Sequence, residues 1–140
     1  MKLHIISVGK SKESWLQEAL QFYIERLQGT LTIEMSYVKD DERLIAVVAK
    51  EKNCIALDPK GKLMDSPAFA HYLFTALEAG GARLSLVIGG PDGLPSTLRE
   101  TLPLISLSPL TMTHQLVRLV LFEQIYRASE IRRGSPYHRK

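Results

Sequence analysis

Short apolar runs alternate with amphipathic stretches along the whole chain. Closely spaced aliphatic side chains, typical of buried strands, occupy the segments 2–9, 31–38, 53–58, 84–90 and 102–108. In the stretches between and after them, apolar side chains recur every three or four residues, which predicts helices. These stretches are the segments 14–29, 40–52, 66–81, 94–102 and 113–132. The alternation predicts an α/β fold with a mainly parallel sheet and helices on both faces, in a single domain spanning residues 1–140.

Capping residues set the expected helix boundaries. Ser14 and Ser66 stand where N-caps are expected, because their hydroxyl groups can accept from the first free amides of a helix. Pro67 fits a first helical turn, Gly29 fits a helix end, and either Gly80 or Gly81 fits the next.

Composition indicates an ordinary globular protein. The chain has 140 residues, of which 45% are hydrophobic and 24% charged, so neither disorder nor a fibrous fold is indicated. No apolar run is long enough to span a bilayer, and the first run is too short for a signal peptide. The single cysteine, Cys54, lies in an apolar run and is expected to be a buried thiol. We therefore expect a cytoplasmic protein with no membrane partner.

Positive charge is concentrated at the C-terminal end. The net charge is +3, yet residues 114–140 alone carry six Lys or Arg against Glu123 and Glu130. Nucleic acid is the first partner that such an asymmetry indicates. A basic tail that frays in solvent is the other interpretation.

Three strand ends carry unusual loops, at 56–61, 88–93 and 106–113. Ligands of parallel α/β sheets bind beyond the carboxyl ends of the strands, where such loops gather. The middle loop, IGGPDG, lacks the lysine of a phosphate-binding P-loop and the spacing of a dinucleotide fingerprint. It is therefore either a turn that needs glycine or a place where backbone approaches a ligand closely.

The last stretch, 113–132, is apolar nearly all round. Such a helix must be covered on more than one side, and a partner subunit is a natural cover. His114 and Arg118 are four residues apart, as are Glu123 and Arg127, so each pair shares a helix face. Either they are ordinary helical pairs, or the charged members are used in function, because unpaired charges are costly to bury. The four histidines show no metal-ligand spacing, and no metal is expected.

Several segments together resemble one family. VIGGPDGL, SLSPLTMTHQLVRLVLFEQIYRA and the terminal PYHR, with the MKL…VGK start and ALDPKGK, are similar to the bacterial ribosomal RNA large subunit methyltransferase H family of the SPOUT superfamily. The resemblance covers essentially the whole chain. Pro109 departs from it, because a small or basic residue is expected there and proline removes an amide donor.

The resemblance implies a homodimer with a C-terminal trefoil knot. It also implies S-adenosylmethionine as cofactor and methylation of N3 of a pseudouridine in 23S ribosomal RNA, on the large subunit or the assembled 70S ribosome. The implied cofactor contacts are Leu57, Gly89, Gly90, Ser108, Pro109, Leu110, Thr111, Met112 and Thr113. The implied RNA-binding or catalytic side chains are His114, Arg118, Glu123, Tyr126, Arg127, Tyr137, His138 and Arg139.

The N3 proton of a pseudouridine must leave when the methyl group arrives, so a base is required. Our hypothesis is that His138, delivered by the tail of a second subunit, takes this proton. His114 would then shape the cofactor loop, and Arg118 and Arg139 would hold the base or its phosphate.

Two other functions fit parts of the pattern. A non-enzymatic RNA- or ribosome-binding module with the same fold would share the basic tail. A small-molecule enzyme on a flavodoxin-like sheet would use the glycine loop for its substrate and would not need residues 134–140.

Overall fold

The computed structural model describes residues 1–10 and 13–139, which form five strands and five helices in strict alternation. The strands are β1 (Lys2–Val8), β2 (Thr32–Val38), β3 (Cys54–Leu63), β4 (Arg83–Ile88) and β5 (Leu104–Ser106). The helices are α1 (Ser14–Leu27), α2 (Asp41–Val48), α3 (Ser66–Ala79), α4 (Ser96–Thr101) and α5 (His114–Arg133). The predicted order of strands and helices is confirmed, with shifts of a few residues at most boundaries.

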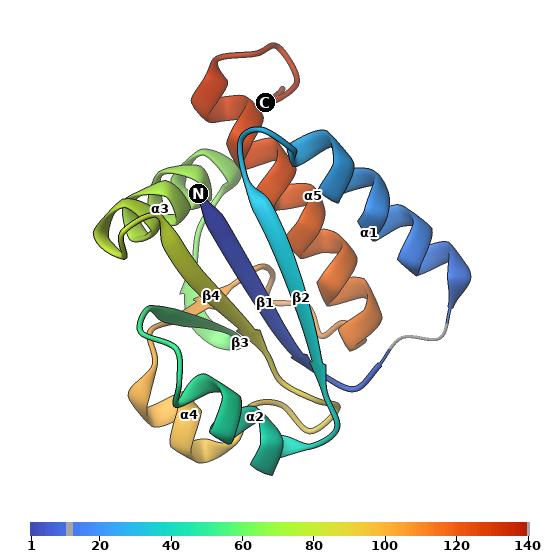
Figure 1. The fold of residues 1–140 in the computed structure, drawn as a ribbon, viewed down its shortest axis with the longest axis vertical. Coiled ribbons are helices and arrows are strands. Elements are labelled where there is room, and N and C mark those ends of the chain that lie inside the picture. Colours follow the sequence, from blue (N-terminus) through green and yellow to red (C-terminus); the bar gives the residue numbers. More distant parts are fainter. Residues whose placement is uncertain (11–12, 140) are drawn as a thin grey trace.

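The five strands form one sheet in the order β2-β1-β4-β3-β5, and every neighbouring pair is parallel (Figure 1). Parallel strands end at the same edge of the sheet, so the carboxyl ends of β4, β3 and β5 lie side by side. The predicted α/β class with a parallel sheet is therefore confirmed.

Helices cover both faces of the sheet. The larger core packs α1, α3 and α5 on one face, with Leu20, Phe74 and Phe122 as representative buried side chains. The smaller core packs α2 and α4 on the other face, through Leu44 and Leu98. Figure 1 shows α5 lying against α1, with α2 and α4 away from both of them.

The observed helix starts correct the expected caps. Asp65 rather than Ser66 caps α3, since its carboxylate accepts from the amide of Ala68 at 2.9 Å. Glu13 precedes α1 without a side-chain capping bond, so Ser14 is the first helical residue instead of the cap. An aspartate one residue before a serine offers an equally good cap, and the sequence alone does not choose between them.

The expected loop at 56–61 is part of β3, because that strand continues to Leu63 by pairing with β5. Both Leu57 and Lys62 pair with Ile105, so the chain bulges between them and folds over the short β5. Gly61 lies against the backbone of β5, where an added Cβ would be 2.6 Å from the carbonyl carbon of Ile105. Non-local pairing thus overrides the local turn signal of DPKG. The prediction that Cys54 is buried is also wrong, because its side chain is only half-buried.

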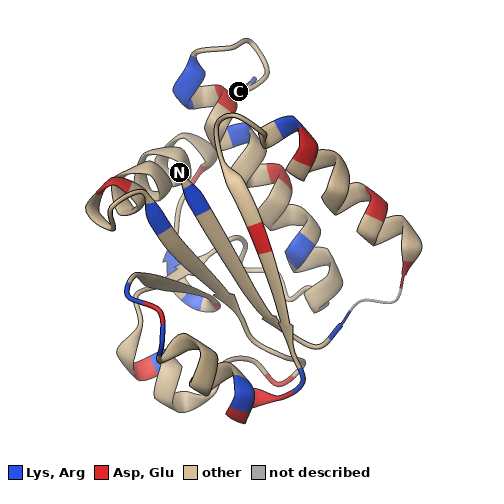
Figure 2. Cartoon of the chain, viewed as in Figure 1, with Lys and Arg blue, Asp and Glu red and all other residues tan. Residues whose placement is uncertain are grey.

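The chain ends beyond α5. Gly134 adopts a left-handed φ of 78° and closes this helix. The following tail turns back at the end of α5 that lies beside the amino ends of the strands (Figure 1). Lys and Arg gather at this end of the helix (Figure 2).

Candidate functional site

A pocket of about 680 Å³ opens at the carboxyl ends of β3, β4 and β5 and at the start of α5. Its walls come from residues 57–59 of β3, from residues 88–91, 93 and 94, and from residues 106–108 and 110–113, together with His114, Gln115 and Val117. These segments lie in or directly after strands that are neighbours in the sheet, which is why segments distant in sequence meet here.

The pocket gathers nearly all residues expected to contact a cofactor. Those that line it are Leu57, Gly89, Gly90, Ser108, Leu110, Thr111, Met112 and Thr113. Pro109 is not among the lining residues. The hydroxyl of Ser108 accepts from the amide of Leu110 at 3.0 Å, so the chain bends tightly around Pro109.

The glycine loop is folded on itself. A Cβ on Gly89 would lie 2.6 Å from the carbonyl carbon of Gly93, and one on Gly90 would lie 3.1 Å from Val8 Cγ1. The amide of Gly93 donates to the carbonyl of Gly90 at 2.9 Å. Glycine is therefore required by the turn itself, and the same turn forms one wall of the pocket.

Asp58 carries a carboxylate in the pocket wall, and its side chain is only 6% exposed. Its Oδ1 accepts from the amide of Lys60 at 2.8 Å, and its Oδ2 accepts from Arg99 Nε at 3.2 Å. Arg99 of α4 also donates to the carbonyl of Leu94 at 3.0 Å. This network ties the end of β3 to the glycine loop.

Arg118 is completely buried and holds the start of α5 to the end of β1. Its Nε donates to Ser7 Oγ at 2.9 Å, and its Nη2 donates to the carbonyls of Val8 at 2.9 Å and Gly9 at 2.6 Å. The ring centroid of Tyr37 lies 5.0 Å from the guanidinium carbon. Burial lowers the pKa of Arg118. Arg118 therefore links α5 to the end of β1. Its Nη1 has no hydrogen-bond partner among the described residues.

His114 begins α5 and lines the pocket. Burial, and secondarily the positive charge of Arg118, lower the pKa of His114, so a neutral imidazole faces the pocket near pH 7. The two residues share a helix face as expected, but the guanidinium bonds to β1 instead.

A second polar group lies at the far end of α5. Arg127 Nη2 donates to Glu123 Oε2 at 2.9 Å, and the hydroxyl of Tyr137 donates to the same oxygen at 2.8 Å. Arg127 Nη1 donates to His138 Nδ1 at 3.1 Å. Tyr126 packs edge-on against Tyr137 with ring centroids 4.9 Å apart. The tail is therefore docked on α5 by these contacts.

Mutual hydrogen bonds shift the pKa values of this group. Burial of Glu123 opposes ionisation, but hydrogen bonds from Arg127 and Tyr137 outweigh it and lower the pKa of Glu123. Burial and the bond to Glu123 raise the pKa of Tyr137 to about 12, so its hydroxyl keeps its proton. Arg139 is exposed beside this group.

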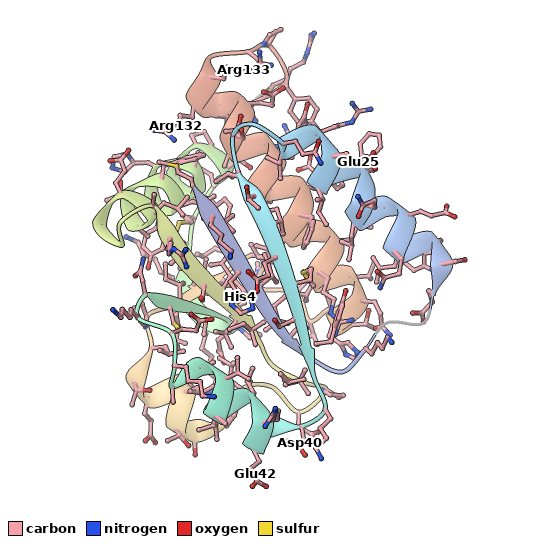
Figure 3. The ribbon with its side chains drawn as sticks, in the orientation of Figure 1. His4, Glu25, Asp40, Glu42, Arg132 and Arg133 are labelled. Atoms are coloured by element: carbon pink, nitrogen blue, oxygen red, sulfur yellow. The ribbon has the colours of Figure 1, made fainter. Side chains whose placement is uncertain are left out.

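The two groups are far apart within one chain. His114 and Arg127 are 13 positions apart along α5, about 20 Å at the rise of an α-helix. In Figure 3, Arg132 and Arg133 of α5 lie at one end of the molecule, and Asp40 and Glu42 lie at the other. Those two acids line a hollow together with Gly90, at the end where the pocket lies. A single chain thus does not bring His138, Tyr137 or Arg139 to the pocket.

Sequence reasoning missed several pocket residues. Asp58 was passed over because DPKG reads as a surface turn, although a lone carboxylate directly after a buried strand is a usable signal. Gln115 and Val117 line the pocket from α5, where helical periodicity alone does not separate core from pocket.

The described residues contain no metal-binding group and no membrane span. Within residues 1–10 and 13–139, no three His, Cys, Asp or Glu side chains come together in a way that could hold a metal ion. None of the helices in this part of the chain is long and apolar enough to cross a bilayer.

Comparisons with known proteins agree with the geometry. A family model described as "Predicted SPOUT methyltransferase" matches residues 1–138. The ribosomal RNA large subunit methyltransferase H of Protochlamydia amoebophila (strain UWE25) is 50% identical over 99% of both chains. The protein of the same name from Pelobacter propionicus is 37% identical over 99% of both chains. A solved structure of a methylase family protein from Haemophilus influenzae Rd KW20 is 9% identical and superposes with a TM-score of 0.60, covering 99% of this chain and 70% of the other, which shows a shared fold.

Proposed function

The chain belongs to the SPOUT methyltransferase family, and its relatives of matching length are ribosomal RNA large subunit methyltransferases H; we propose that it methylates N3 of a pseudouridine in 23S ribosomal RNA. The methyl donor is S-adenosylmethionine, and the substrate is the rRNA of the large subunit or the assembled 70S ribosome, in the cytoplasm. The observation that carries the proposal is the pocket, because its walls are the segments that the family resemblance assigns to the cofactor.

The pocket fits such a cofactor in size and chemistry. Its volume of about 680 Å³ lies within the range of small-molecule sites, ~300–1,000 Å³. Aliphatic side chains such as Leu57, Ile88 and Val117 suit the flat adenine, and the backbone of the Gly90 turn is open to close approach. The hydroxyl groups of Ser108 and Thr111 can form hydrogen bonds with the polar atoms of the cofactor.

When bound, S-adenosylmethionine supplies an electrophilic methyl group on a positively charged sulfur. Transfer of that methyl group to N3 would form the N3–carbon bond as the carbon–sulfur bond broke, would leave the electron pair on sulfur, and would require a base to take the N3 proton. The chain must therefore place N3 in line with the methyl group and offer a proton acceptor. Neutral His114 lies in the pocket of the same chain, whereas His138 reaches it only from another chain.

This separation supports a homodimer. His138 and Arg139 follow the end of α5 opposite the pocket and do not line the pocket of their own chain, so we assign them to the pocket of a second copy, paired through antiparallel α5 helices. Apolar side chains exposed on α1 and α5 support this surface: Trp15 is 52% exposed, Phe22 48% and Leu116 44%. Arg139 and the basic end of α5 then face the RNA.

We also propose that the C-terminal part of the chain forms a trefoil knot. The pairing of both Leu57 and Lys62 with Ile105 supports it, because the chain between those two residues bulges where the later strand β5 lies.

Transfer of a labelled methyl group tests the proposal. We expect incorporation into 70S or 50S ribosomes from a strain lacking the modification, with nucleoside analysis giving N3-methylpseudouridine and naked 23S RNA accepting far less. His138→Ala should lose at least about 100-fold in kcat near pH 7, the scale of general base catalysis. His71→Ala, an exposed histidine on α3, is the matched control.

Two results would contradict the proposal. Full transfer by His138→Ala would remove the assignment of the base. Absence of any calorimetric signal with S-adenosylmethionine would instead favour the non-enzymatic RNA-binding module.

A further inference from the structure

Asp58 is the only residue lining the pocket, among those that the structure describes, whose side chain carries a full charge at neutral pH. The remaining lining residues are aliphatic, glycine, proline, hydroxyl or amide residues, apart from His114. With its carboxylate 6% exposed, Asp58 is screened by little water, so its charge acts strongly on anything bound nearby.

Two hydrogen bonds hold the Asp58 carboxylate in place. The amide of Lys60 donates to its Oδ1, and Arg99 Nε donates to its Oδ2. A carboxylate oxygen accepts more than one hydrogen bond, so both oxygens keep accepting capacity. Arg99 is the opposing charge, but its side chain is 42% exposed, so solvent screens it more than it screens Asp58.

The position of Asp58 is central. β3 lies between β4 and β5 in the sheet, so Asp58, at the point where β3 passes the pocket, has the glycine loop on one side and residues 106–113 on the other. A bound ligand that contacts both walls must therefore pass close to this carboxylate.

We infer that Asp58 is the anion that makes the pocket prefer the charged methyl donor to its neutral product. The inference rests on the proposed function, in which the cofactor loses the sulfonium charge together with its methyl group. S-adenosylhomocysteine lacks that charge and otherwise shares the adenosine and amino-acid parts. A fixed negative charge in a weakly screened wall stabilises the first ligand more than the second. Asp58 is thus a specificity-determining residue that also favours release of the spent cofactor.

Calorimetric affinities of both ligands test this role without any turnover. Wild-type protein should bind S-adenosylmethionine more tightly than S-adenosylhomocysteine, and Asp58→Asn should reduce that preference by about three- to tenfold. Asparagine keeps an oxygen to accept from the amide of Lys60, so the bulge retains one of its bonds. Arg99→Gln removes the opposing charge and leaves the carboxylate, so the preference should persist or increase.

The preference should fall in Asp58→Asn and not in Arg99→Gln, and this difference separates electrostatics from structural damage. Asp92→Asn is the matched control, because it removes the same charge from an exposed position in the glycine loop that does not line the pocket. An equal loss of affinity for both ligands in Asp58→Asn and Arg99→Gln would overturn the inference. Equal affinities in wild-type protein would overturn it even if Asp58→Asn failed to fold. Failure of the proposed function is distinguishable, since wild-type protein would then bind neither ligand.

Discussion

At the scale of single residues, Gly61 shows how sharply one atom is constrained. Its Cα faces the backbone of β5, and a Cβ would meet the amide nitrogen and carbonyl carbon of Ile105 at 2.6 Å. Backbone of a paired strand cannot move aside as a flexible side chain can. Glycine at this position is therefore required by space.

We expect Gly61→Ala to lower the free energy of unfolding by about 3 kcal/mol, the upper range for overpacking. Gly29→Ala is the comparison, because a Cβ there meets nothing within 4 Å and only its φ of 89° is unfavourable. Gly29→Ala should lower the free energy of unfolding by about 1 kcal/mol. Denaturant unfolding of both variants measures the difference, and equal losses would show that the close approach is absent in solution.

Arg118 illustrates what residue-level reading from sequence misses. Its cost of burial and its i, i+4 relation to His114 were predictable from spacing. Its partners Ser7, Val8 and Gly9 lie about 110 positions earlier, and no local pattern indicates them. Arg118 is completely buried in one chain. Its expected contact with RNA therefore stays a proposal.

At the scale of elements, strands and helices were predictable because their periodicities are local. The short β5 and the continuation of β3 to Leu63 were not, because they depend on each other's pairing. The pocket loops after β4 and β5 were predictable as strand ends, whereas the loop expected after β3 is replaced by a bulge. The tail's docking on α5 was also beyond the sequence, since Glu123 bonds Tyr137 across 14 positions.

The docked tail should depend on pH through Glu123. Its pKa in the folded chain is lowered, so its contribution to docking is complete above the ordinary carboxyl value and is lost as pH falls through the lowered one. We expect the tail to remain docked near pH 6 and to release only when the pH falls below the ordinary glutamate value of about 4.3. NMR order parameters of residues 135–139 measure this.

Glu123→Gln should release the tail already at neutral pH, because it removes the charge that bonds Arg127 and Tyr137. The local loss should be about 1 kcal/mol, with little change in global unfolding. An unchanged order parameter in this variant would show that ring contacts with Tyr126 hold the tail instead.

At the scale of the whole molecule, α5 connects the pocket at its start to the polar group around Glu123 and the tail at its end. Its first residues border the pocket and its last turns hold the tail, so the proposed shared site requires the opposite ends of two such helices to meet. The apolar character of the helix predicted a cover on more than one side. α1 and α3 supply part of that cover, and Leu116 remains 44% exposed.

Leu116→Glu should therefore convert the proposed dimer to a monomer and reduce methyl transfer at least about 100-fold, by placing a charge in an apolar interface. Leu63→Glu is the matched control, because Leu63 is an exposed leucine at the end of β3. Analytical ultracentrifugation and circular dichroism distinguish dissociation from unfolding. A fully active Leu116→Glu monomer would exclude the shared site.

The folding of β3 over β5 also has a consequence in time. Each wall of the pocket depends on pairing between strands that are distant in sequence, because β3 pairs with both β4 and β5. Such late, non-local pairing is slow compared with helix formation. In refolding experiments, the capacity to bind the methyl donor should thus recover after helical circular dichroism has recovered. In a cell, newly made chains would therefore pass through a state in which the helices have formed but the methyl donor does not yet bind.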